Sequence, residues 1–276
     1  MAGFFGFFDY TKPGKGVKKE EYKPDFSTFV RIFTSRFWKI LRLNMLFVVC
    51  SLPLIAVLIM FYPLDNEGNT DAVAQFMYYT ACLLYLSVVG FSPVMAGFTY
   101  VLRNFARDRH SWGASDFFEH ILKNIKQSLV LLVMDSIIFF TLWYLFSVYT
   151  RISGLEGADN ILIATGIIGR TIILIISAVY FIMHFYIYQI IITFDMKLNQ
   201  ILKNSFIFTV IKLPRNIGVV LLMLVASSLA FGFISQIGLI LSFFILPAAI
   251  CFTVSFITAP VIEKYMMPQK TDNTEA

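Results

Sequence analysis

The chain has 276 residues, of which 58% are hydrophobic and 14% are charged, and its formal net charge is +5. Soluble domains are about 45–50% apolar and about 25% charged, so this composition excludes a soluble protein and indicates an integral membrane protein. In such a protein an excess of basic residues reports topology, and we expect no nucleic-acid partner.

The first 24 residues are predicted to form a flexible cytosolic tail, because lysine, proline and glycine are frequent there. Their apolar start lacks the basic region and the cleavage site of a signal peptide. We therefore expect insertion through the first spanning helix. A single membrane domain is predicted over residues 25–264, followed by a second cytosolic tail over 265–276.

Six apolar segments are long enough to cross the hydrocarbon core, which requires about 20 helical residues. These segments are 40–62, 73–102, 128–149, 161–194, 217–233 and 239–262. Prolines at positions 53, 93 and 247 predict kinks in the first, second and sixth segments. The sequence therefore predicts an all-α polytopic bundle of six transmembrane helices.

Basic residues fix the expected orientation of these six helices. Nearly all of the 22 Lys and Arg residues lie in the first tail, after the second and fourth segments, or after the sixth. The positive-inside rule then places both termini in the cytoplasm. The opposite loops are acidic, and the role of the one at 64–71 stays open.

Three basic amphipathic stretches are predicted to form helices at the cytosolic interface, over 25–44, 116–127 and 195–206. Asp116 and Glu119 have the spacing of a capping box, which predicts that the second of these helices begins after Asp116. The chain can be divided into units 25–103, 116–194 and 195–264, each an interfacial helix followed by a hairpin. Parallel repeats of this kind occur in transporters, although the slight identity between these units also arises by chance.

A basic elbow joins the second and third spanning segments. Each basic residue close to an anionic bilayer contributes about 1 kcal/mol to binding, and tryptophan anchors helices at the interface. We predict that the elbow contacts anionic lipid headgroups, or alternatively a partner protein. Its candidate residues are Arg103, Arg107, Arg109, Trp112, Lys123 and Lys126.

Asp135 and His184 are ionisable residues inside the third and fourth segments. Such residues are rare in membranes and are functional candidates. Both lie about 12–15 Å from the cytosolic side, so they can pair if the two helices touch. Two interpretations remain open: a polar site for a proton or a solute, or an interhelical hydrogen bond that stabilises the bundle.

Motifs for nucleotide, metal or nucleophile chemistry are absent from the sequence. We therefore expect no cofactor and no metal, and we expect that the protein is not an enzyme. An intramembrane enzyme remains a remote alternative.

One stretch of the sequence resembles the YesL family of uncharacterised membrane proteins, found mainly in Gram-positive bacteria. The pattern is a small residue and proline, then Ala-Gly, then Tyr-Val-Leu-Arg, then Asp-Phe-Phe. The matching residues are Ser92, Pro93, Ala96, Gly97, Tyr100, Val101, Leu102, Arg103, Asp116, Phe117 and Phe118. Segments 43–55 and 192–205 agree as well, whereas about 35 residues at 56–90 are extra relative to many members.

This resemblance implies a bacterial cell membrane protein that acts beside carbohydrate uptake systems with ATP-driven importers. It implies no catalytic or ligand residues, and it leaves the oligomeric state open. The function expected from it is that of a non-enzymatic accessory or regulatory component that contacts importer subunits. The alternative is a small-solute transporter that uses Asp135 and His184.

Overall fold

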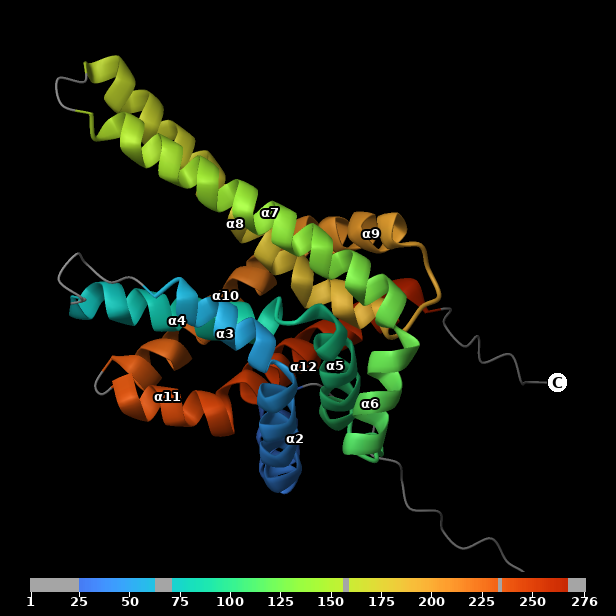
Figure 1. Cartoon of the computed structure of the whole chain (residues 1–276). Coiled ribbons are helices and arrows are strands. Elements are labelled where there is room, and N and C mark those ends of the chain that lie inside the picture. Colours follow the sequence, from blue (N-terminus) through green and yellow to red (C-terminus); the bar gives the residue numbers. More distant parts are fainter. Residues whose placement is uncertain (1–24, 63–70, 156–158, 233–234, 268–276) are drawn as a thin grey trace, which may run out of the picture.

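The computed structural model describes residues 25–62, 71–155, 159–232 and 235–267, and within these ranges the regular structure is entirely helical (Figure 1). The expected tail at 1–24, nearly all of the acidic loop at 64–71 and most of the tail at 265–276 lie outside these ranges. The helices are α1 (Phe26–Ser35), α2 (Phe37–Cys50), α3 (Leu52–Met60), α4 (Ala72–Val88), α5 (Ser92–Ala106), α6 (Ala114–Lys123), α7 (Ile125–Ser153), α8 (Asn160–Ile191), α9 (Leu198–Ile211), α10 (Leu213–Phe231), α11 (Ser235–Phe244) and α12 (Leu246–Met266).

Four of these helices, α7, α8, α10 and α12, are long and apolar enough to cross a membrane singly. The pairs α2–α3 and α4–α5 are apolar enough together, and they bend by 62° and 71° at their joints, which brings the total to six if each pair is one span. The predicted helical membrane bundle is therefore confirmed.

Both bends lie where proline predicts them. Pro53 lies in the first turn of α3, and Pro93 lies in the first turn of α5, where a missing N–H costs least. Gly90 lies just after the end of α4. Its backbone is in the left-handed region, with φ of 57°, and its N–H donates to the carbonyl of Tyr85 at 2.8 Å. A side chain at position 90 would also collide with Met95, so this joint needs glycine.

The sixth predicted segment, 239–262, is not one helix. It is broken at Ile245, where α11 ends and α12 begins with Pro247 in its first turn. The fully buried side chain of Asn44 fills the break: its Oδ1 accepts from the N–H of Ala248 at 2.8 Å, and its Nδ2 donates to the carbonyl of Phe243 at 2.7 Å. Irregular backbone at membrane depth is tolerated where protein groups satisfy it in this way.

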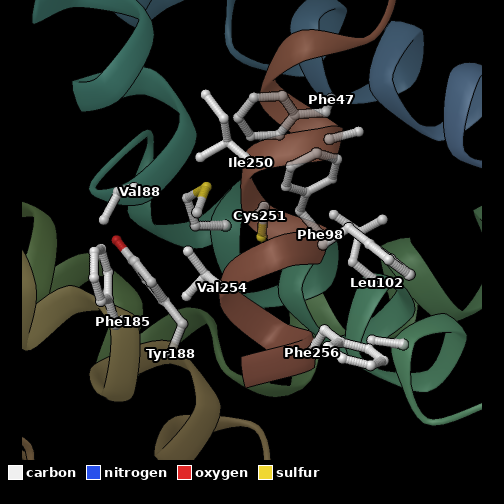
Figure 2. Packing of buried hydrophobic residues seen from close by; sticks show 14 of the residues in the cluster. Phe47, Val88, Phe98, Leu102, Phe185, Tyr188, Ile250, Cys251, Val254 and Phe256 are labelled. Atoms are coloured by element: carbon white, nitrogen blue, oxygen red, sulfur yellow. The ribbon is translucent and has the colours of Figure 1, made fainter. Parts of the chain in front are cut away.

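Helix α12 is the centre of the bundle and packs against α2, α4, α5 and α8. Figure 2 shows α12 carrying Ile250, Cys251 and Val254 into the core, with Tyr188 and Phe185 on one side of it. The rings of Phe47 and Phe98 stack there at a centroid distance of 4.0 Å. This central position explains why 72% of the most apolar 18-residue window of α12 is buried, against 11% and 17% for those of α7 and α8.

Helices α7 and α8 form a long antiparallel hairpin, and its closed end projects away from the other helices (Figure 1). At 1.5 Å per residue, their 29 and 32 residues correspond to about 43 and 48 Å, against about 30 Å for a hydrocarbon core. The expectation that the fourth span tilts or projects is in line with this length.

The short helices α1, α6 and α9 lie within the predicted amphipathic stretches or overlap them. Helix α6 begins at Ala114, before Asp116, which differs from the predicted start. Asp116 instead closes the preceding turn, because its Oδ2 accepts from Ser111 Oγ at 2.6 Å and from the N–H of Trp112 at 2.8 Å. Helix α6 packs directly on Gly97 of α5, where any side chain would collide with the backbone of Phe117.

Candidate functional site

The centre of the candidate site is Asp135 on α7, which faces α5 and α8 and is 3% exposed. Its Oδ1 accepts a hydrogen bond from Tyr180 at 2.5 Å and lies 3.2 Å from Nε2 of His184. Its Oδ2 accepts from Ser92 Oγ at 3.0 Å. The structure thus brings Asp135 and His184 together from two helices, as their equal depth suggested.

The hydrogen bonds of His184 determine how many protons this pair holds. Its Nδ1 lies 3.0 Å from the carbonyl oxygen of Tyr180, which can only accept, so Nδ1 carries a hydrogen. A bond between Nε2 and a carboxylate oxygen also requires a hydrogen. With this assignment, a hydrogen bond between Nε2 and Oδ1 of Asp135 would need one further proton, carried by the imidazole or by the carboxyl group.

The joint between α4 and α5 also contributes residues to the site, beside those of α7 and α8. Ser92 is the first residue of α5, so Asp135 lies at the N-terminus of that half-helix, where the helix dipole favours negative charge. Tyr188 donates to the carbonyl of Val89 at the end of α4, and its hydroxyl lies 3.1 Å from Ser92 Oγ. The site therefore lies at the 71° bend between two apolar helices, and transporters use discontinuous helices of this kind for ion and solute binding.

A cavity of about 10 Å³ lies beside the pair, lined by residues of α4, α5, α8 and α12 that include His184, Tyr188 and Gln189. This volume is about that of one water probe. Gln189 is 2% exposed, and within the described ranges its Oε1 has no hydrogen-bond partner. The cavity can hold one water molecule, but it is far too small for a solute.

The three arginines of the predicted elbow all contact one carboxylate, that of Glu263 on α12. Arg107 is paired with Glu263 of α12, and Arg103 and Arg109 lie 3.9 and 3.4 Å from the same carboxylate. Arg103 is 7% exposed and also bonds Thr193. These contacts join α5 to α12 and α8, which gives the arginines a packing role inside the protein.

The other elbow residues face outward. Trp112 is 77% exposed, and Lys123 and Lys126 are exposed where α6 meets α7. These two lysines line a groove of about 680 Å³ that also takes in the connection from α8 to α9, including Asp195. The structure thus divides the elbow into an inner arginine cluster and an outer lysine groove.

Sequence reasoning did not identify Tyr180, Ser92 and Glu263 as site residues. Tyr180 precedes His184 by four positions and therefore shares its helix face, a spacing that could have identified it. Ser92 directly precedes Pro93, where the sequence predicts a kink. Glu263 is an acidic residue next to Lys264 at the basic end of the last span. Helix packing, which no local pattern encodes, decides which of these residues meet.

Among the described residues, no group of three or more His, Cys, Asp or Glu side chains is arranged to hold a metal ion. No protein-family model matches the chain, and neither a curated protein nor a solved structure shows significant similarity to it. The site itself is therefore the basis for any functional proposal.

Proposed function

We propose that this multi-pass membrane protein carries a small polar solute across the membrane, coupled to protonation of the Asp135–His184 pair. The observation behind the proposal is the buried 3.2 Å contact between Asp135 Oδ1 and His184 Nε2, which can hold one shared proton. Two ionisable side chains buried inside spanning helices are costly. A pair that shares one proton, and can release it, is the arrangement that proton-coupled carriers need.

The broken span beside the pair supports the same proposal. Loss of the proton would leave Asp135 charged, hydrogen-bonded to Ser92 and Tyr180, at the N-terminus of α5. Release of the proton to one side of the membrane would therefore strengthen that attraction and move α5 at the Gly90 joint. The described state is a closed one, because its cavity of about 10 Å³ admits no solute.

The first prediction concerns Asp135→Asn in purified protein reconstituted into vesicles with a trapped pH-sensitive dye. Sugars and amino acids are added outside one at a time, and we expect at least one to drive proton entry with the unaltered protein. Asparagine keeps the shape but cannot exchange a proton, so we expect Asp135→Asn to reduce that flux at least about 100-fold, the low end of what proton-transfer groups contribute.

Asp71→Asn is the matched control, because Asp71 caps α4 outside the site and asparagine caps a helix equally well. Its flux is expected to equal that of the unaltered protein. Unchanged flux in Asp135→Asn, or the absence of any solute-driven flux in the unaltered protein, would contradict a proton-coupled carrier.

A second candidate function is that of a non-enzymatic accessory component beside a carbohydrate importer in a bacterial cell membrane with both termini cytoplasmic. The resemblance to the YesL family and the distribution of basic residues support it. The structural observation in its favour is the α7–α8 hairpin, whose closed end projects (Figure 1) and which exposes large apolar side chains such as Trp143 and Ile168 along its length. A partner's spanning helices could pack there in place of lipid.

This second function predicts that importer subunits copurify with the tagged protein from native membranes in mild detergent. We expect Trp143→Ala to lower their recovery, because tryptophan anchors dominate interfaces. Trp38→Ala, which alters an exposed tryptophan on α2, is expected to leave recovery unchanged. Recovery of the protein alone, identified by mass spectrometry, would count against an accessory role.

A further inference from the structure

The groove between the α6–α7 joint and the α8–α9 connection has a composition suited to one kind of ligand. Its volume is about 680 Å³, which lies within the usual range of about 300–1,000 Å³ for ligand sites. We propose that it binds the headgroup of an anionic phospholipid through Lys123 and Lys126. This inference is independent of the proposed transport function.

The location of the groove favours a lipid over a soluble ligand. Helix α7 begins at Ile125 and α8 ends at Ile191, and both helices are candidate membrane spans. The groove contains both of these ends. It therefore lies at the level where a spanning helix passes from hydrocarbon to water, which is where lipid phosphates are concentrated.

Charge favours an anionic headgroup. Lys123 and Lys126 are three positions apart and both line the groove, and no ion pair of either lysine is found within the described ranges. Asp195 is the one carboxylate among the lining residues, so the groove carries a net charge of about +1. The elbow arginines differ, because all three already have contacts with the carboxylate of Glu263.

The neighbouring apolar surface suits the acyl chains of the same lipid. Leu129, Val130 and Val133 follow on α7 toward the membrane interior, and all three are about half exposed. A lipid whose phosphate contacts the lysines would lay its chains along this face of α7. Headgroup and chains would thus be bound by one continuous surface of the protein.

The test uses purified protein in a neutral detergent, titrated with phosphatidylglycerol or phosphatidylcholine, with bound lipid counted by native mass spectrometry. We expect phosphatidylglycerol to bind more tightly than phosphatidylcholine. Each lysine is expected to contribute about fivefold, so the double variant Lys123→Gln/Lys126→Gln should lose about 25-fold in phosphatidylglycerol affinity. Its weak binding of phosphatidylcholine should not change, and Lys123→Arg/Lys126→Arg should retain the preference.

The control pair Lys39→Gln/Lys203→Gln removes the same charge from exposed positions outside the groove lining. We expect this pair to lose less than about threefold in affinity. An equal loss in the control pair would show diffuse charge attraction and would overturn the proposal. Equal binding of the two lipids, or displacement of phosphatidylglycerol by an equimolar amount of soluble glycerol 3-phosphate, would overturn it too.

Discussion

Asn44→Leu is expected to destabilise the protein by about 2–4 kcal/mol, because each buried polar group left unpaired costs about 1–3 kcal/mol. The substitution removes the acceptor of the Ala248 N–H and the donor to the Phe243 carbonyl. Asn44 is fully buried and water cannot replace it. Unfolding in mixed detergent micelles, followed by circular dichroism, measures the loss.

This expected loss exceeds the average of about 0.6 kcal/mol for a side-chain hydrogen bond between membrane helices. The difference arises because Asn44 serves backbone groups at the break between α11 and α12, where Pro247 prevents the regular helical bond. Asn199→Leu alters an exposed asparagine on α9 and is the matched control, with an expected change below about 0.5 kcal/mol. Equal stability of Asn44→Leu and the control would show that the break is satisfied by other means.

The positions of the apolar helices, four to six of which are candidate membrane spans, could be predicted because apolar length is a local property of the chain. The bend before Pro93 could be predicted for the same reason, since proline acts on its own backbone. The break at Ile245 lies where Pro247 predicts a kink, but the sequence does not show how the backbone groups exposed by the break are satisfied. What allows the chain to break there is the amide of Asn44, about 200 positions earlier in the sequence.

The candidate site, too, has features that could be predicted from the sequence and others that could not. The equal depth of Asp135 and His184 followed from counting residues along two antiparallel helices. The contacts of Asp135 with Ser92 and of Arg107 with Glu263 depend on how α5 packs against α7 and α12. The elbow was predicted as one basic surface, and its division into paired arginines and outward lysines follows from a carboxylate 156 positions away.

Replacement of Asp135 by leucine is expected to destabilise the protein by about 3–5 kcal/mol, as is typical when one partner of a buried pair is removed. Leucine would leave the hydroxyls of Ser92 and Tyr180 and the Nε2 atom of His184 without their present partner. Asparagine at the same position can still donate to a neutral His184 and accept from Ser92, and it loses only the hydrogen bond from Tyr180, so Asp135→Asn is expected to cost about 1–2 kcal/mol.

A double-mutant cycle with Asp135→Leu and His184→Leu measures the pair itself, again by unfolding in mixed micelles. Because each side chain loses its partner in the single variants, we expect the double variant to be more stable than additivity predicts by about 1–3 kcal/mol. Additive effects within about 0.5 kcal/mol would mean that the 3.2 Å contact contributes nothing to stability.

The same variants separate the two interpretations of the pair. If its only role is to join α7 to α8, stability and solute-driven flux should fall together across the series. If the pair transfers a proton, Asp135→Asn should stay folded and yet lose its flux, because the amide keeps the hydrogen bonds to Ser92 and His184 and cannot titrate. A stable, folded Asp135→Asn protein without flux would therefore support the carrier function, since loss of folding could not explain the result.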